Sequence, residues 1–365
     1  MKRFVLIMLV LMCAFAVSAS GAAEKAAAEK IYVLGPTPDH GWTAQAGAFA
    51  EQKCNELKAA GTNAVFMPAS SGETQVDYVN TIIANGDAKV VVIQVLDDSA
   101  EAAVEALVAA KIPVIQFDRF AIALKPKAIL NFAGDNISCG AGIAAWLQSN
   151  GMKPGDAIVT LYGDNGSVCI DRESGFRGFL NGTVDYTDNA TGKTVHTTEV
   201  WAESDIKAAL STYSVVCNWS ADGAAQFMEQ KLTDILADAK KKGGNLYIYS
   251  MDDEMTFGVL NVLEAASAKD QKDAEELHIY ISAIGGMQEL YDVMSGKSAQ
   301  AAVANRFFDN MMSVSFNPSM MIQAINYAVD YANGNWTYPL GAEEKQPVWI
   351  VDRTNATQYQ GFMGH

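Results

Sequence analysis

The stretch IPVIQFDR, from Ile112 to Arg119, indicates the fold of the whole chain. It is a short apolar run that follows a Lys-Ile-Pro turn and stops at an Asp118-Arg119 pair. Such a run is typical of a buried strand in a parallel sheet. Ligands of open α/β sheets lie outside the carboxyl ends of the strands, so the acid and the base are placed to meet a ligand. A surface ion pair that caps the strand is the alternative interpretation of these two residues.

Strands and helices alternate on both sides of this stretch. Short apolar strands are predicted at 31–35, 64–68, 90–96, 128–133, 157–162, 245–250, 278–284 and 299–304, with a closing strand around Trp349. Helical patterns separate them, and the last long helix is expected to contain Met311 and Tyr331. The polar, Thr-rich stretch 183–217 is less periodic and indicates an insertion or an elaborated hairpin. This alternation predicts an α/β protein with two doubly wound, parallel-sheet (Rossmann-like) lobes.

The N-terminus has the layout of a secretory signal peptide, predicted to span residues 1–19. Lys2-Arg3 precede an apolar run, small residues follow it, and the expected cleavage site is after Ala19, with Ala22 or Ala23 as alternatives. The apolar run is too short to span a bilayer comfortably. Lipid attachment at Cys13 is a further alternative, although the preceding Met12 is bulky where a small residue is required. We therefore expect a periplasmic or otherwise extracytoplasmic protein.

Composition limits the partners of the mature chain. Without Lys2 and Arg3, 24 basic residues face 42 acidic ones, a net charge of −18. A chain this acidic repels nucleic acid and anionic lipid, so nucleic acid is excluded as a partner. With 365 residues, half of them hydrophobic, the chain can bury two cores. Of the four remaining cysteines, Cys169 and Cys217 flank an irregular region and could pair in an oxidising compartment.

Polar and aromatic side chains gather just past the predicted strand ends. They comprise carboxylates, amides, guanidinium groups and indoles: Asp39, His40, Trp42, Gln94, Asp118, Arg119, Arg172, Trp219, Asp252 and Asn305. Sugar hydroxyls both donate and accept hydrogen bonds, and the C–H faces of a sugar ring pack on indoles. Because Trp42 and Trp219 lie in different halves of the chain, a cleft between two lobes could hold a flat ring from both sides. Core packing is the alternative role for each indole.

An ordered set of seven motifs identifies a family resemblance. These are DHGW (39–42), IPVIQFDR (112–119), GDN (134–136), RESGF (172–176), NW (218–219), MDDEM (251–255) and AVAN (302–305). In this order and spacing they resemble the type I periplasmic sugar-binding proteins of ABC transporters, the ribose-binding protein group, from about residue 31 to 353. The resemblance implies a monomer that binds a monosaccharide by hinge closure and presents it to a membrane permease, without cofactor, metal or catalytic residue.

The resemblance also implies a domain organisation and roles for single residues. The chain would cross between lobes three times, giving a first lobe of 28–133 and 306–340 and a second of 134–305 and 341–365. Asp39, Trp42, Gln94, Asp118 and Arg119 would face the ligand from the first lobe, with His40 beside them. Arg172, Trp219, Asp252 and Asn305 would face it from the second lobe. Gly285-Gly286 stand where the ribose binder has an aspartate, and the first loop retains only one aromatic, which argues against ribose itself.

Two other functions compete with this hypothesis. The run Gly140-Ala-Gly142-Ile-Ala-Ala145 matches a dinucleotide-binding pattern and would suit a nicotinamide-dependent sugar dehydrogenase. Four residues separate its glycines from the preceding strand, however, so the tight turn that pyrophosphate needs is displaced. An exported sugar sensor for a receptor kinase or chemoreceptor is the other alternative. The carboxylates of MDDEM could bind a metal, but an acidic helix N-terminus is the simpler interpretation.

Overall fold

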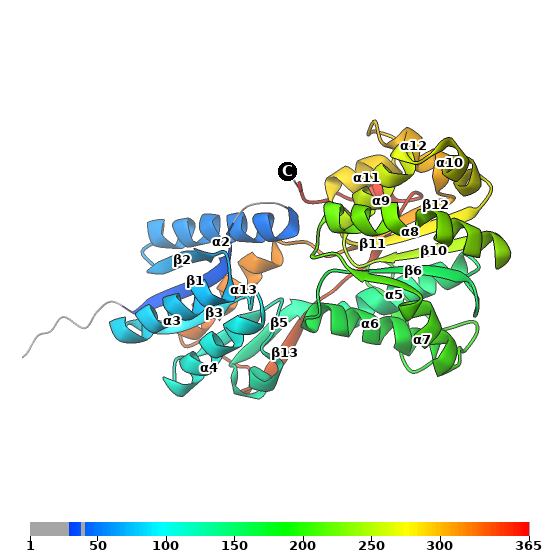
Figure 1. Ribbon diagram of the computed structural model, residues 1–365. Helices are drawn as coiled ribbons and strands as arrows, with labels where there is room; N and C mark the ends of the chain where they lie inside the picture. Colours follow the sequence, from blue (N-terminus) through cyan, green and yellow to red (C-terminus); the bar gives the residue numbers. More distant parts are fainter. Residues whose placement is uncertain (1–28, 38–40, 365) are drawn as a thin grey trace, which may run out of the picture.

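The computed structural model describes residues 29–37 and 41–364, which form two α/β lobes lying side by side (Figure 1). The first lobe is built on sheet A, with strand order β13-β5-β4-β3-β1-β2. The second is built on sheet B, with strand order β14-β12-β11-β10-β6-β9. All neighbouring strands in both sheets are parallel except the β12/β14 pair. The predicted fold class is therefore confirmed.

Sheet A is covered on both faces, and its central strands are mainly apolar. Its strands are β1 (Lys30–Pro36), β2 (Ala64–Ala69), β3 (Ala88–Ile93), β4 (Val114–Phe117), β5 (Leu130–Gly134) and β13 (Ala342–Gln346). Ile31 and Val33 of β1 enter one apolar core, whereas Tyr32 and Leu34 enter a second core on the opposite face. Helices α2 (Gly41–Ala59) and α13 (Met320–Ala332) contribute to the first core, and α3 (Gly72–Asn85) and α4 (Glu101–Ala109) to the second. Side chains that alternate with a period of two thus reach helices on both faces.

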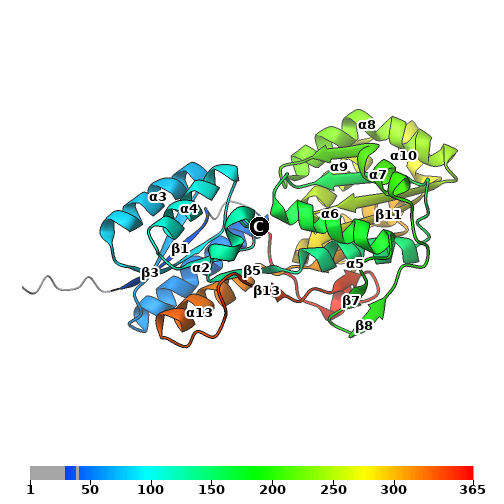
Figure 2. The ribbon, with the colours of Figure 1, turned by 90° about the horizontal axis from the view of Figure 1, so that it is seen from below.

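Sheet B has the same layered construction. Its strands are β6 (Ala157–Tyr162), β9 (Tyr213–Val216), β10 (Asn245–Ser250), β11 (His278–Gly285), β12 (Asn310–Ser315) and β14 (Ile350–Asp352). Helices α5 (Asn136–Ser149) and α6 (Ser167–Leu180) cover one face, and α8 (Ala221–Lys241) and α9 (Asp253–Ala265) cover the other (Figures 1 and 2). The shorter helices of the lobe include α10 (Ala268–Glu275), α11 (Gln288–Met294) and α12 (Ala301–Phe307).

The chain crosses between the lobes three times. The first crossing joins β5 to α5 at Asp135. The second lies between β12 and α13, because β12 still pairs with β11 of sheet B. The third lies between β13, which pairs with β5, and β14, which pairs with β12. The structure thus places the second and third crossings after Ser315 and Gln346, rather than at the expected 305–306 and 340–341.

The error in the second crossing has a local cause. The stretch 299–304, predicted as a strand, belongs to the turn before α12 and to α12 itself, which is rich in alanine, the best helix former. The strand is β12, a few residues later, and it includes Met311, which was assigned to the last helix. The segment 183–217 also differs from its interpretation as an insertion or an elaborated hairpin. This segment contains a hairpin, β7 (Tyr186–Asp188) with β8 (Lys193–Val195), but also α7 (Glu203–Ser211) and β9, which extends sheet B.

Helices α5 and α6 approach closely because glycines face backbone atoms across their interface. A Cβ on Gly140 would lie 1.8 Å from the carbonyl oxygen of Arg172, and one on Gly175 would lie 1.9 Å from that of Ile137. A Cβ on Gly142 would lie 2.8 Å from the ring of Tyr186. The glycines of the dinucleotide-like pattern therefore lie within a helix and serve helix packing, so the pattern no longer supports a dehydrogenase.

The remaining sequence-based expectations concern cysteines and membrane segments. Cys54, Cys139, Cys169 and Cys217 are buried free thiols, so the structure does not contain the considered Cys169–Cys217 bond. Burial raises the pKa of Cys169 to about 11 and that of the other three to about 12. No helix in the described part of the chain is long and apolar enough to cross a bilayer. The predicted signal peptide and Cys13 lie outside the described residues.

Candidate functional site

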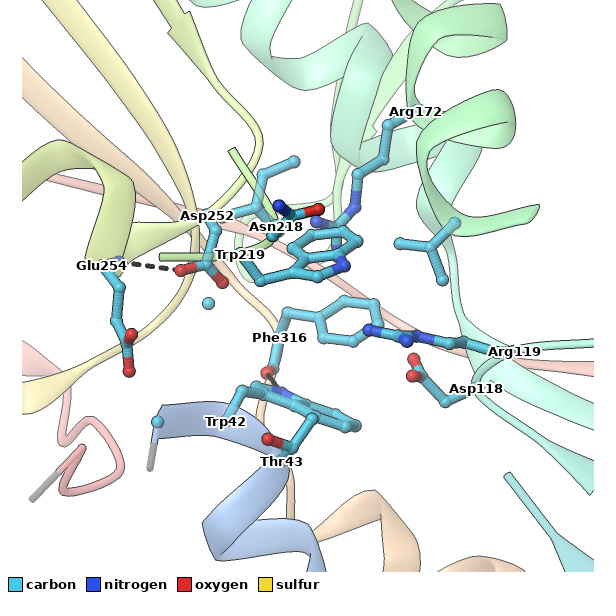
Figure 3. Close-up of a pocket in the computed structure, with 14 residues that line it drawn as sticks. Trp42, Thr43, Asp118, Arg119, Arg172, Asn218, Trp219, Asp252, Glu254 and Phe316 are labelled. Carbon is cyan, nitrogen blue, oxygen red and sulfur yellow. Dashed lines mark hydrogen bonds between the residues drawn. The ribbon is translucent and has the colours of Figure 1, made fainter. Parts of the chain in front are cut away.

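A cavity of about 160 Å³ lies between the lobes, where the carboxyl ends of strands from both sheets meet (Figure 3). The first lobe lines it with Gly41, Trp42, Thr43, Asp118 and Arg119. The second lobe and the second crossing line it with Val168, Arg172, Asn218, Trp219, Asp252, Glu254, Ile284, Gly285 and Phe316. Lining residues lie in the loops after β4, β9, β10 and β12, at the end of β11 and in the first turn of α2, which is the position expected for a ligand of open α/β sheets.

Asp118 enters the cavity from the end of β4 in a left-handed backbone conformation, with φ +60°. Its carboxylate accepts a hydrogen bond of 2.8 Å from the side-chain amide of Gln94, which is fully buried. Burial raises the pKa of Asp118 above its usual value, and the nearby guanidinium groups of Arg119 and Arg172 oppose part of that rise. Gln94 does not line the cavity, so its predicted contact with ligand is replaced by a role in positioning Asp118.

Trp42, in the first turn of α2, forms an aromatic wall of the cavity. Its indole N–H donates to the carbonyl oxygen of Phe316 at 2.6 Å. Its ring stacks on Phe117, at 6.2 Å between centroids and an interplanar angle of 15°, and lies tilted against Phe316 at 5.6 Å. Phe316 fits beside the first crossing because Gly134 has no side chain. A Cβ on Gly134 would lie 1.9 Å from the Phe316 ring. The orientation of Trp42 is thus fixed by both lobes.

Trp219 lines the cavity from the second lobe. Asn218 and Trp219 are both left-handed, with φ +52° and +57°, so the chain turns sharply between β9 and α8. The indole N–H donates to Asp164 at 2.8 Å. The ring packs so closely on Gly163 that a Cβ there would lie 2.2 Å from it. Trp42 and Trp219 therefore line one shared cavity from different lobes (Figure 3).

The two arginines of the cavity come from different lobes and both approach Trp219. The guanidinium carbon of Arg119 lies 5.3 Å from the indole centroid, and that of Arg172 lies 5.5 Å from it. Arg119 also donates to the carbonyl oxygen of Leu96 and lies 3.6 Å from the carboxylate of Asp164. Arg172 is buried and donates to the side chain of Asn136 and the carbonyl oxygen of Met251. Both cations are thus held in place by protein groups while they border the cavity.

Carboxylates at the start of α9 form the acidic side of the cavity. Asp252 caps the helix by accepting from the Glu254 N–H at 2.8 Å. Burial, reinforced by the charges of Asp253 and Glu254, raises the pKa of Asp252 well above its usual value. Glu254 points across to the first lobe, where a Cβ on Gly41 would lie 2.0 Å from its carboxylate oxygen. The MDDEM carboxylates thus form the acidic N-terminus of a helix, which was the simpler interpretation of this motif from the sequence.

The structure brings together most, but not all, of the predicted site residues. Trp42, Asp118, Arg119, Arg172, Trp219 and Asp252 line the cavity. Asn305 does not: it is exposed on α12, because the strand that was expected to end there is β12. Phe316, directly after β12, occupies the position that was assigned to Asn305. Asp39 and His40 lie outside the described residues.

Sequence analysis missed Thr43, Asn218, Glu254 and Phe316 as lining residues. The first three are neighbours in sequence of predicted residues, so the rule that placed Trp42, Trp219 and Asp252 past strand ends could have included them. For Phe316, the signal is the Asn317-Pro318 break after an apolar run, which marks the end of β12.

The lining offers hydrogen-bond donors, acceptors and aromatic surface together. Three carboxyl groups, Asp118, Asp252 and Glu254, line the cavity together with two guanidinium groups, and the raised pKa values of Asp118 and Asp252 favour their neutral forms. Hydroxyl groups can satisfy both kinds of side chain because each donates and accepts. Within 29–37 and 41–364, no group of His, Cys, Asp and Glu side chains is arranged to bind a metal ion. The cavity is therefore suited to a neutral, hydroxyl-rich guest with an apolar face.

Comparison with known proteins identifies the family. Residues 31–335 match the family described as "Periplasmic binding protein domain", and the chain belongs to it. Its two parallel-sheet lobes have the architecture of type I periplasmic binding proteins, which confirms the resemblance seen in the sequence motifs. No curated protein sequence matches the chain significantly.

Solved structures share the fold at low sequence identity. A galactofuranose-binding protein is 20% identical with a TM-score of 0.64, over 90% of this chain and 96% of that one. The arabinose-binding component of an ABC transporter from Shewanella sp. ANA-3 is 18% identical with a TM-score of 0.64, over 90% and 93% of the two chains. The fructose-binding periplasmic domain of a hybrid two-component system is 17% identical with a TM-score of 0.62, over 90% and 92%.

Proposed function

We propose that this chain is the extracytoplasmic substrate-binding protein of an ABC importer. It binds a neutral monosaccharide, a pentose, a hexose or a related polyol, in the cavity between its lobes. The observation that supports this most is the pair of indoles, Trp42 and Trp219, which line one cavity from opposite lobes among carboxylates and guanidinium groups. The galactofuranose- and arabinose-binding structures that share the fold are consistent with a sugar ligand.

Binding would be coupled to closure of the lobes about the three crossings. Trp42, Asp118 and Arg119 belong to one lobe, and Arg172, Trp219 and Asp252 to the other, so a guest gains all its contacts only when the lobes approach. A ligand favours the conformation in which it makes more contacts. The closed, sugar-loaded monomer would then present its surface to the permease. In this proposal the protein performs no chemistry on its ligand and requires no cofactor.

The test is a thermal-shift screen with D-ribose, L-arabinose, D-galactose, D-glucose, D-fructose and myo-inositol, with amino acids as a contrasting ligand class. A sugar that binds should raise the Tm by a few degrees at a concentration of about 100 times its Kd, where binding adds about 2.7 kcal/mol to stability. The amino acids should leave the Tm unchanged. Stabilisation by an amino acid and by none of the sugars would contradict the proposal.

A sensor is the second candidate function, since the fructose-binding domain of a two-component system has the same fold. Such a protein would bind its sugar in the same way but deliver the signal to a receptor kinase or chemoreceptor. Genes for a permease and an ATPase beside the coding gene would favour the importer. A neighbouring receptor gene with neither of these would favour the sensor.

A further inference from the structure

A second open space borders the inter-lobe cavity. This groove, of about 690 Å³, is larger than the cavity, at about 160 Å³. It lies between the loops that follow β3 and β4 in the first lobe and β6 and β9 in the second. It therefore occupies the same carboxyl edges of the two sheets as the cavity does. Arg119, Asn218 and Trp219 border both spaces, so a guest in the cavity lies next to the groove.

The boundary between cavity and groove consists of the side chains of Arg119, Asn218 and Trp219. Arg119 approaches Asp164 no closer than 3.6 Å, whereas a charge-assisted hydrogen bond is usually 2.7–2.9 Å long. Both side chains remain partly exposed. On the far side, the two lobes touch where the Phe120 N–H donates to Ser167 Oγ at 3.2 Å. The groove is thus a defined space between the lobes with a side-chain boundary toward the cavity.

The groove combines apolar and polar surface. Among the described residues six large apolar side chains are exposed, and two of them, Ile122 and Ile170, border this groove. They are 52% and 53% exposed and come from opposite lobes. Asn165 and Ser167 border the same space with amide and hydroxyl groups. Apolar surface on both sides with hydrogen-bonding groups between suits the C–H faces and hydroxyls of a sugar ring.

The charge of the groove excludes some ligands. Asp97, Asp98, Glu101 and Asp164 border it, and Arg119 is its only basic side chain among the described residues. Phosphate or carboxylate substituents would be repelled by this excess of negative charge. A sugar unit that occupies the groove should therefore be neutral.

We propose that the groove is a second sugar subsite and that the ligand is a neutral disaccharide or other glycoside. One ring lies in the cavity between Trp42 and Trp219, and the linked unit passes Arg119 and Trp219 into the groove between Ile122 and Ile170. This inference rests on the proposed function, since it extends the ligand of the same cleft. It specifies an extended ligand where that proposal requires only a single ring.

The test compares monosaccharides with disaccharides by isothermal titration calorimetry. D-galactose, D-glucose and D-fructose are titrated beside lactose, melibiose, maltose, cellobiose and sucrose. At least one disaccharide should bind tenfold or more tightly than each of its component sugars. If a monosaccharide binds and no disaccharide exceeds it, the second subsite is refuted while the proposed function stands. If no disaccharide binds, the second subsite is refuted, and the thermal-shift screen with pentoses and polyols decides the proposed function separately.

Matched variants assign the effect to the groove. Ile170→Trp fills the groove from an exposed position and should weaken the disaccharide tenfold or more while leaving monosaccharide affinity within twofold. Val200→Trp is the control, because Val200 is 66% exposed in the same lobe and does not border the groove. It should change neither affinity. An equal loss for both classes of sugar in Ile170→Trp, or no loss for either, would overturn the assignment.

Discussion

Three side chains of the cavity project from left-handed backbone, which residues other than glycine rarely adopt. Asp118, Asn218 and Trp219 have φ values between +52° and +60°. Each such residue costs on the order of 1–3 kcal/mol and persists only when its surroundings enforce it. Hydrogen bonds hold two of these side chains in place: the Gln94 amide donates to Asp118, and the Trp219 indole donates to Asp164. Three of the four described non-glycine residues in this conformation thus line the cavity, and Lys111 is the fourth.

Replacing Trp219 tests whether its indole contacts the ligand. Trp219→Ala should weaken sugar binding by about 1–3 kcal/mol, or roughly 5- to 150-fold in Kd, because an aromatic contact in a desolvated site is lost. Trp219→Phe keeps a ring but loses the N–H to Asp164, so it should lose less. The measurement is calorimetry with the sugar that the thermal-shift screen selects. Wild-type affinity in Trp219→Ala, beside an equally unaffected Trp336→Ala control outside the cavity, would remove Trp219 from the site.

Asp253 should make stability depend on pH. It is buried beside the cavity, accepts from the Met287 N–H and the Ser313 hydroxyl, and burial raises its pKa to about 6. An unfolded aspartate has a pKa near 3.9, so between about pH 4 and pH 6 the folded state binds more protons than the unfolded state. The free energy of unfolding should therefore fall by about 3 kcal/mol as pH rises through this window.

Asp253→Asn removes the titrating group and should abolish this part of the pH dependence. Urea unfolding of both proteins between pH 4 and pH 7 measures it. A variant whose stability changes with pH as steeply as that of the wild type would show that another group is responsible.

At the scale of elements, the sequence predicted most of the regular units and missed several others, among them α7, β9 and the order of α12 and β12. The strands at 31–35, 157–162 and 245–250 were predictable because a parallel strand buried on both faces is a short, continuous apolar run. The exchange of α12 and β12 was not predicted, because the periodicity of a short apolar run does not separate a buried strand from a helix. Because of this exchange, Asn305 was predicted to line the site at the position that Phe316 occupies.

The site itself was predictable only in part, for a physical reason. Residues past strand ends, such as Asp118 and Trp219, follow from topology alone. Whether such a residue faces the guest or supports a neighbour depends on packing. Gln94 illustrates this, because it lies one residue past β3 but behind Asp118, where its amide satisfies a carboxylate.

The contact between α5 and α6 provides a prediction at this scale. Gly140→Ala would place a Cβ 1.8 Å from backbone, which cannot move aside, so the helices should separate at a cost of about 2–3 kcal/mol. Gly142→Ala is the matched control on the same helix, since its Cβ would meet the edge of the Tyr186 ring at 2.8 Å, and a ring can shift. Thermal unfolding should show the larger loss for Gly140→Ala. Equal losses in the two variants would contradict this account of the glycines.

At the scale of the whole molecule, the cavity belongs to neither lobe alone. Its donors, acceptors and indoles are divided between the lobes, and three crossings of the chain join the lobes within the described residues. The sequence motifs predicted this division, while the strand pairing determines where the second and third crossings lie.

Ligand binding should therefore change the shape of the molecule. Small-angle X-ray scattering with and without a saturating sugar should show a smaller radius of gyration in its presence, because contacts on both walls favour the closed form. A non-binding sugar from the thermal-shift screen is the control. Tight binding with unchanged scattering would contradict hinge closure and favour a cleft that is already closed.

The strand pairing of β13 has a consequence for how the chain is made. Sheet A starts with residues 30–36 but receives its last strand from residues 342–346, about 300 residues later in the chain. A nascent chain emerging from the ribosome cannot complete its first lobe until residues 342–346 have been translated. Maturation should thus be one late event involving both halves, and a prematurely terminated product would possess neither half intact.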